Sequence, residues 1–130
     1  MKLLIDTQVF VWLTNEDERL GVEALRTLQN VSNQLYISYF SFFEMTLKAS
    51  IGKLVYDSSI LEDLPSMGIE LIMPDTVVLN GYKIFNPENK DPFDNILIAT
   101  ALNEKCLFVT SDSRILSTNL HSLNLVDATK

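Results

Sequence analysis

Leu3-Leu4-Ile5-Asp6-Thr7 is the stretch of sequence that decides the fold. Three consecutive aliphatic residues lie almost at the start of the chain and stop abruptly at a carboxylate. A short, unbroken apolar run is typical of a strand that is covered on both faces of a parallel sheet. An acid at the end of such a strand lies at the carboxyl edge of the sheet, where open α/β folds bind their ligands. The functional residues are therefore expected to gather beside Asp6.

Extended and helical segments alternate along the rest of the chain. Further strands are expected at 35–38, 69–73, 107–110 and 123–126, and helices at 8–13, 22–28, 39–50, 58–67, 77–84, 92–101 and shortly after 112. Thr7 and Asp91 are the expected N-caps of two of these helices, and Gly52 is the expected stop signal of the 39–50 helix. This order predicts an α/β fold with three layers, in which helices flank a central parallel sheet. No repeat or linker interrupts it, so residues 1–130 are expected to form a single domain.

Composition narrows the class of protein. With 130 residues, of which 47% are hydrophobic, the chain can bury a sizeable core. The single cysteine, Cys106, cannot form an internal disulfide and lies in an apolar run, as expected of a buried thiol in a reducing compartment. No apolar run approaches the roughly 20 residues of a membrane span. These features predict a cytoplasmic protein that does not enter membranes.

The net charge of −7 counts against nucleic-acid binding, because phosphate contacts require clustered Lys and Arg. That count includes only the protein's own charges. Divalent cations held by some of the carboxylates would offset part of the negative charge, so composition alone leaves nucleic-acid binding open.

Four carboxylates occupy positions where acids are costly. Asp6 and Asp112 each follow a strand of the buried type, whereas Glu44 and Asp94 each share a helical face with apolar residues. A carboxylate set among apolar side chains is destabilising unless a partner satisfies it. Each also has a purely structural explanation: Asp6 and Asp112 as helix caps, Asp94 as a first-turn acid, and Glu44 as a partner of Lys48 one turn later.

Convergence of these acids would require a cation or protons. Two carboxylates about 4 Å apart repel each other by roughly 4 kcal/mol at an effective dielectric constant near 20. Oxygen ligands favour Mg²⁺ or Mn²⁺ over zinc. The only histidine, His121, is distant in sequence from the acidic motifs, which excludes a His-rich zinc site, and it is interpreted as a surface residue.

Four short motifs occur in a fixed order along nearly the whole chain. They are Leu4-Ile5-Asp6-Thr7 with Trp12 downstream, Phe43-Glu44 before Gly52-Lys53-Leu54, Asp91-Pro92-Phe93-Asp94 before Leu97-Ile98-Ala99, and Val109-Thr110-Ser111-Asp112. Together they resemble the PIN domain, and within that superfamily the VapC-type toxins of type II toxin–antitoxin systems. One departure is Asn89-Lys90, where many relatives carry a basic pair with His just before the Asp-Pro-Phe-Asp motif.

The resemblance implies a function as well as a fold. It implies a metal-dependent endoribonuclease, the toxin of a toxin–antitoxin pair, in which the family's four acidic positions match Asp6, Glu44, Asp94 and Asp112. These residues are the expected catalytic and metal-binding residues, with Mg²⁺ or Mn²⁺ as cofactor. The resemblance further implies RNA as substrate, a cognate antitoxin that blocks the site, and a homodimer.

Several other residues have expected roles. Phe42 and Met45, on the helix face opposite Glu44, and the segment 10–12 are expected to supply apolar surface for dimerisation. Hydrolysis would use a water activated by the metal. Hydroxyl groups that could bond to the acids are expected at Thr7, Thr110 and Ser111. Four cations near the motifs are candidates for contacts with backbone phosphate, although each is more simply explained as a solvated surface residue: Lys48, Lys53, Lys90 and Arg114.

Two alternatives stay open. A catalytically silent PIN module would act only as a binding partner, and its sign would be the loss of one of the four acids. A phosphoacceptor receiver is also a small acidic α/β domain. It is disfavoured because Thr7, not a second acid, follows Asp6, and because no Lys ends the last expected strand.

Overall fold

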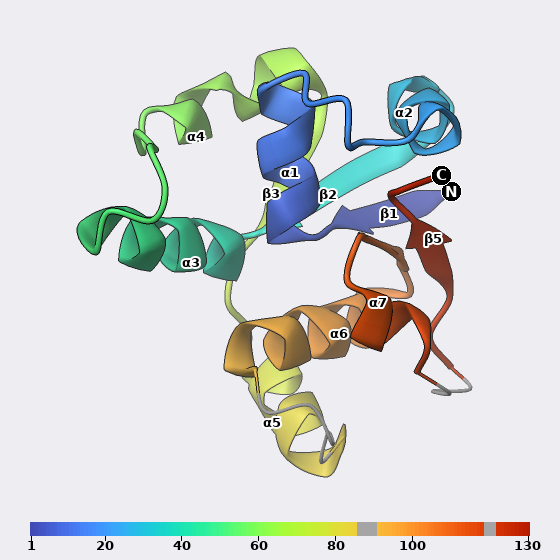
Figure 1. Cartoon of the computed structure of the whole chain (residues 1–130). Coiled ribbons are helices and arrows are strands. Elements are labelled where there is room, and N and C mark those ends of the chain that lie inside the picture. Colours follow the sequence, from blue (N-terminus) through green and yellow to red (C-terminus); the bar gives the residue numbers. More distant parts are fainter. Residues whose placement is uncertain (86–90, 119–121) are drawn as a thin grey trace.

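A parallel sheet forms the centre of the protein (Figure 1). The computed structural model describes residues 1–85, 91–118 and 122–130. The strands in this part of the chain are β1 (Lys2–Ile5), β2 (Gln34–Ser38), β3 (Ile69–Ile72), β4 (Leu107–Thr110) and β5 (Leu125–Asp127). They are arranged in the order β3-β2-β1-β4-β5, and every neighbouring pair is parallel. The predicted α/β class with a central parallel sheet is confirmed.

Helices connect these strands. They are α1 (Thr7–Thr14), α2 (Val22–Gln29), α3 (Tyr39–Ser50), α4 (Ile60–Asp63), the 3₁₀ turn η1 (Leu64–Met67), α5 (Thr76–Phe85), α6 (Pro92–Glu104) and α7 (Ser113–Leu116). None of the helices in the described ranges is long and apolar enough to cross a membrane.

Two predicted elements differ from the observed ones. The expected helix at 58–67 is split into α4 and η1, because Pro65 has no N–H to donate and its ring opposes a continuing helix. The last strand begins at Leu125, two residues later than predicted. Leu123 is buried, but the backbone meets β4 only from Asn124, whose carbonyl accepts from the Phe108 N–H.

The core has two layers, one on each face of the sheet. Alternate residues of β1 serve the two layers, since successive strand side chains point to opposite faces. Leu3 and Ile5 pack with residues of α1 and α2, whereas Leu4 packs with residues of α5 and α6. Leu3, Leu4 and Ile5 of β1 are completely buried, which explains this unbroken apolar run in the sequence.

Helix α1 is capped by Asp6, which was the structural alternative considered for this acid, and not by Thr7 as predicted. The Asp6 side chain accepts a hydrogen bond from the Thr7 N–H at 2.7 Å, and Thr7 is already the first helical residue. Asp91 caps α6 as predicted, accepting from the Phe93 N–H at 2.9 Å. Gly52 follows α3 with a positive φ of 74°, in agreement with its predicted role as a stop signal.

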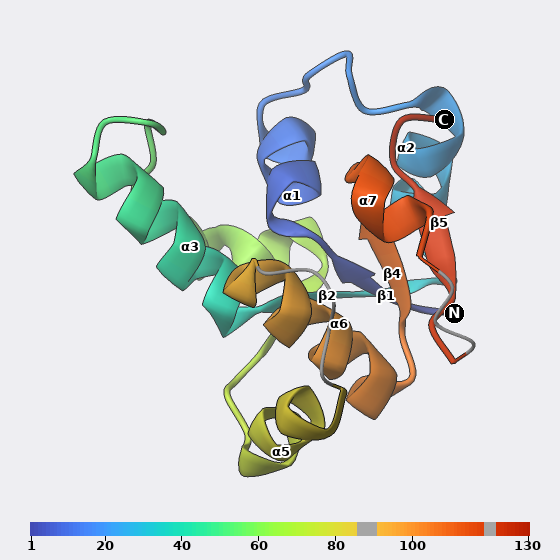
Figure 2. The same ribbon diagram turned by 60° about the horizontal axis from the view of Figure 1, so that its bottom comes forward.

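Helix α3 extends beyond the edge of the sheet in both ribbon views (Figures 1 and 2). Phe42 and Met45 on this helix are buried in the core, as are Phe10 and Trp12 of α1. The prediction that these side chains offer spare surface for dimerisation is therefore wrong, because they anchor α3 to α1. The apolar side chains that α3 exposes lie on another face.

The C-terminal residues pack against the start of α2. The Gly21 N–H donates to the Ala128 carbonyl at 2.8 Å, and the Glu23 N–H donates to the Lys130 carbonyl at 3.1 Å. A Cβ atom at position 21 would lie only 2.0 Å from the carbonyl carbon of Lys130. Glycine is therefore required here by close backbone approach.

Gly21→Ala is expected to destabilise the protein by about 1–3 kcal/mol, because the backbone at Lys130 must move away. Gly81→Ala is the matched control: it lies within α5 with no atom within 4 Å of the added Cβ, and should be neutral or stabilising by up to about 1 kcal/mol. Urea denaturation of both variants measures the difference. A Gly21→Ala protein as stable as the wild type would contradict this packing.

Candidate acidic active site

The candidate site lies at the carboxyl edge of the sheet, where β1 and β4 are neighbours. The chain proceeds outward from β1 through β2 to β3, and then returns to place β4 on the other side of β1. Ligands of open α/β sheets bind at such a reversal of strand order. Asp6 follows β1 and Asp112 lies two residues after β4, so both acids reach this point, as predicted.

Asp6 is buried and held by two hydrogen bonds. One carboxylate oxygen accepts from the Thr7 N–H at 2.7 Å, and the other accepts from the Thr110 hydroxyl at 2.6 Å. Burial raises the pKa of Asp6 to about 7, and the negative charges of Asp94 and Glu44 add to this increase while the hydrogen bonds oppose it. The position therefore disfavours an isolated negative charge.

Glu44 reaches the site from the middle of α3, which begins directly after β2. It is buried, and the Thr7 hydroxyl donates to it at 2.8 Å. The Ser41 hydroxyl lies 3.0 Å from that of Thr7 and is placed to donate to it, because a threonine hydroxyl has only one hydrogen to give. Lys48 forms an ion pair with Glu44 at 2.8 Å, one turn along the helix, so this predicted structural pairing is present.

Asp94 and Asp112 share one cation. Asp94 lies in the first turn of α6 and is buried, whereas Asp112 caps α7 and is half-buried. The Arg114 guanidinium lies 3.0 Å from Asp112 and 3.7 Å from Asp94. Its hydrogen bonds lower the pKa of Asp112. The cap predicted for Asp112 is thus also observed, since its side chain accepts from the Arg114 N–H at 2.8 Å.

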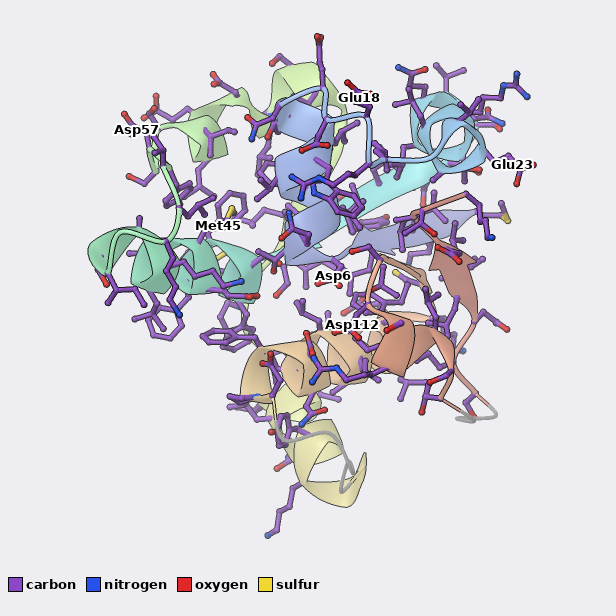
Figure 3. All side chains as sticks on the ribbon, viewed as in Figure 1. Asp6, Glu18, Glu23, Met45, Asp57 and Asp112 are labelled. Carbon is purple, nitrogen blue, oxygen red and sulfur yellow. The ribbon has the colours of Figure 1, made fainter. Side chains whose placement is uncertain are left out.

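Short links join these four acids into one site. Thr7 bonds to both Asp6 and Glu44, and the Thr110 hydroxyl that donates to Asp6 also accepts from the backbone N–H of Asp112. Figure 3 shows Asp6 and Asp112 in the region between α1 and α6. The other acids labelled there, Glu18, Glu23 and Asp57, lie at the periphery.

Comparison with known proteins identifies the family. The profile of the PIN domain matches residues 3–119, which is most of the chain. The chain belongs to the PIN domain family. The predicted family is therefore confirmed, and the four acids occupy the carboxyl edge of a PIN fold.

Solved structures of similar fold are toxin–antitoxin complexes. VapBC2 from Rickettsia felis, bound to a DNA fragment from its promoter, aligns at a TM-score of 0.72 with 18% identity over 98% of both chains. VapBC-1 from nontypeable Haemophilus influenzae aligns at 0.65 with 19% identity over the whole of both chains. A toxin–antitoxin complex from Klebsiella pneumoniae aligns at 0.63 with 16% identity over 97% of both. Among curated proteins, no sequence matches the chain.

The acids of this PIN domain suit a hard divalent cation in type, although they do not form a ready-made cage. Among the described residues, no three His, Cys, Asp or Glu side chains are arranged to hold one ion together. Lys48 and Arg114 instead pair with three of the four acids. The donor set nevertheless consists of carboxylate and hydroxyl oxygens around a buried acid whose charged form is disfavoured, which fits Mg²⁺ or Mn²⁺.

Some of the residues predicted for this PIN site are observed there, others lie outside the described part of the chain, and one residue of the site was not predicted. Thr7 and Thr110 are hydroxyl partners of the acids, as expected. His121 and Lys90 lie outside the described residues. Ser41, which is completely buried beside Thr7, was not predicted. Its spacing of three residues from Glu44 on one helix was the available signal.

The raised pKa of Asp6 predicts a characteristic dependence of stability on pH. An acid whose pKa is higher in the folded chain than in the unfolded chain stabilises the fold while it is protonated, and this contribution is lost as the pH rises. With EDTA present, the Asp6 contribution is expected to fall between pH 4 and about 7 by at most about 1.4 kcal/mol per pH unit. Urea denaturation at several pH values measures it.

Asp6→Asn is expected to remove this component of the pH dependence, because the amide keeps an acceptor oxygen but does not titrate. Glu18→Gln, which changes an exposed peripheral acid, should leave the wild-type profile unchanged. Identical profiles for the wild type and Asp6→Asn would show that Asp6 is not the group responsible.

Proposed function

We propose that this PIN domain, formed by residues 1–130, is a VapC-type toxin that acts in the cytoplasm as a divalent-metal-dependent endoribonuclease. PIN domains of VapC toxins are typically nucleases. The observation that carries the proposal is the grouping of Asp6, Glu44, Asp94 and Asp112 at one edge of the sheet, around a buried acid. The alternative of a phosphoacceptor receiver has no support from the family match.

Asp6, Glu44, Asp94 and Asp112 would hold Mg²⁺ or Mn²⁺ through their carboxylate oxygens. PIN nuclease domains usually use divalent metal ions. When bound, such an ion supplies Lewis-acid chemistry that activates water and offsets the charge developing on a phosphodiester. The silent-module alternative predicts the loss of an acid, and all four are present.

The protein's own groups orient the acids and attract the substrate. Thr110 and Thr7 fix the carboxylates of Asp6 and Glu44 by hydrogen bonds, which limits the rotation of each group. Lys48 and Arg114 place positive charge beside the acids. A phosphate approaching the site would otherwise meet only negative charge, so these cations would reduce the repulsion that the substrate experiences.

A cognate antitoxin is the proposed protein partner. The solved structures described above pair PIN toxins with antitoxins, two of them in VapBC complexes from Rickettsia felis and Haemophilus influenzae. Their low sequence identity to this chain supports the shared fold, and the partner is proposed by analogy with them. We propose that the free toxin cleaves RNA and that the toxin bound to its antitoxin does not.

Asp6→Asn and Asp94→Asn are each expected to reduce Mg²⁺-dependent cleavage of single-stranded RNA at least about 100-fold, because each removes a charged metal ligand. Glu18→Gln is the matched control and should cleave at the wild-type rate. Gel-based cleavage assays with Mg²⁺, with Mn²⁺ and with EDTA measure the effect, and circular dichroism confirms folding. Full activity in both aspartate variants would reject this site.

We also propose a homodimer, formed by the exposed apolar face of α3. The side chains on this face are Tyr39, Phe43, Leu47 and Ile51, which follow one another at intervals of four residues and are each at least 41% exposed. A continuous apolar stripe of this kind is typical of an interaction surface. This exposed face takes the place of the dimer surface predicted at Phe42 and Met45, because those two side chains are buried.

Leu47→Glu is expected to dissociate this dimer, because it sets a charge in the middle of the apolar face. Val31→Glu, at a fully exposed position outside the helices, is the control and should leave the dimer intact. Light scattering after size exclusion should give twice the 14.7 kDa of one chain for the wild type and the control. A monomeric wild type, or a dimeric Leu47→Glu, would contradict the proposal.

A further inference from the structure

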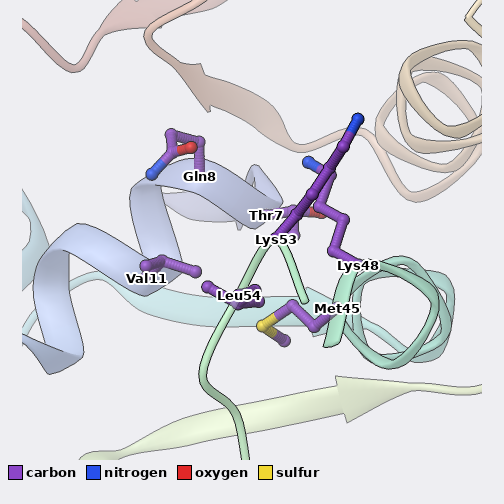
Figure 4. Close-up of a pocket in the computed structure, with 7 residues that line it drawn as sticks. All are labelled: Thr7, Gln8, Val11, Met45, Lys48, Lys53 and Leu54. Carbon is purple, nitrogen blue, oxygen red and sulfur yellow. The ribbon is translucent and has the colours of Figure 1, made fainter. Parts of the chain in front are cut away.

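A pocket of about 260 Å³ opens beside the acidic site, between α1 and α3 (Figure 4). It is lined by Thr7, Gln8, Val11, Met45, Lys48, Lys53 and Leu54. Helix α1 supplies the first three of these residues and α3 supplies the next two, and the segment after α3 folds back to contribute the last two. None of the four acids lines this pocket.

The pocket has a cationic side and an apolar side. Figure 4 shows the side chains of Lys48 and Lys53 extending in the same direction past Thr7. Val11, Met45 and Leu54 lie together away from the ends of the two lysines and form the apolar wall. A ligand that matches both sides carries a negative charge next to a flat or compact apolar body.

Two residues join the pocket to the acids. The Thr7 hydroxyl donates to Glu44 at 2.8 Å, and Lys48 forms its ion pair with the other oxygen of the same carboxylate. The pocket and the acidic site are therefore adjacent and share Thr7 and Lys48. Because Thr7 and Lys48 touch both the pocket and Glu44, a polymer bound at the acids can reach the pocket with a neighbouring residue.

We propose that this pocket binds one nucleotide of a single-stranded RNA substrate, the nucleotide that flanks the scissile phosphodiester. Its phosphate lies between Lys48 and Lys53, and its base lies against the wall formed by Val11, Met45 and Leu54. The inference rests on the proposed nuclease function and adds the subsite that positions the RNA. Single-stranded RNA suits it, because unpaired bases are free to turn into a pocket while the phosphates remain outside.

The charge distribution favours a phosphate over a neutral ligand. The chain carries a net charge of −7, yet the two charged residues that line this pocket are both lysines. A second pocket, of about 580 Å³ beside β3, has the opposite character: it is mostly apolar and its one charged lining residue is Glu70. A phosphate would be repelled there and attracted to the pocket beside the acids.

Lys53→Met tests the subsite, because Lys53 is exposed, lies outside the acidic site, and keeps its apolar stem in the variant. The measurement is kcat and KM for Mg²⁺-dependent cleavage of a short single-stranded RNA, from about 50 to 200 mM salt. We expect KM to rise roughly fivefold with little change in kcat, as for the loss of one phosphate contact. The salt dependence of log kcat/KM should become shallower by about 0.7.

Lys53→Arg should restore both the wild-type KM and the wild-type salt dependence, because it returns the positive charge. Lys83→Met removes an exposed lysine from α5 and is the charge-matched control, expected to behave as the wild type. An abasic substitution in the RNA should raise KM at one position beside the cleaved bond. These results would support the assignment of both sides of the pocket.

Other results would overturn it. A Lys53→Met enzyme with wild-type KM and salt dependence would show that no substrate phosphate lies at Lys53. If the same variant were instead inhibited less strongly by the cognate antitoxin, the pocket would belong to a carboxylate of that protein. Absence of RNA cleavage by the wild type would reject the nuclease function itself, which distinguishes that failure from failure of the subsite.

Discussion

Burial of the Asp6 carboxylate, directly after the three completely buried residues of β1, is the constraint on which the site depends. An unpaired charge in that position is strongly disfavoured, and the raised pKa of Asp6 expresses this cost. Two hydrogen bonds to the carboxylate reduce this cost. One is donated by the N–H of Thr7, the first residue of α1, and the other by the hydroxyl of Thr110, the last residue of β4. The same two contacts that stabilise the acid therefore also bring the neighbouring strand and helix to it.

The fold was predictable because its signals are local. Residues 3–5 and 108–109 are buried on both faces of the sheet, and this requirement leaves apolar runs in the sequence. Acids that follow such runs within two residues mark the carboxyl edge of the sheet, so the positions of Asp6 and Asp112 followed from the strands alone. The start of helix α6 could also be predicted, since an acid at the N-cap, Asp91, followed by Pro92 at the first helical position is a common start signal.

The rest depends on tertiary contacts that a single sequence does not specify. Helix α3 has apolar residues on more than one face, and only its packing against α1 decides that Phe42 is buried while Phe43 is exposed. Periodicity alone could not separate these faces. The strand order and the shared use of Arg114 by Asp94 and Asp112 are likewise properties of the assembled sheet edge.

Lys48 connects the charge balance of the site to the recognition of a substrate. In the acidic site it is a partner of Glu44, and in the neighbouring pocket it lines the wall opposite the apolar residues. The Lys48 side chain is about half exposed and flexible, so its ammonium group can move from Glu44 to another anion nearby. A divalent ion that took over Glu44 would leave the Lys48 ammonium available to a phosphate. Cation binding at the acids and anion binding in the pocket would then favour each other, and this coupling would let a chain with a net charge of −7 bind the proposed RNA substrate.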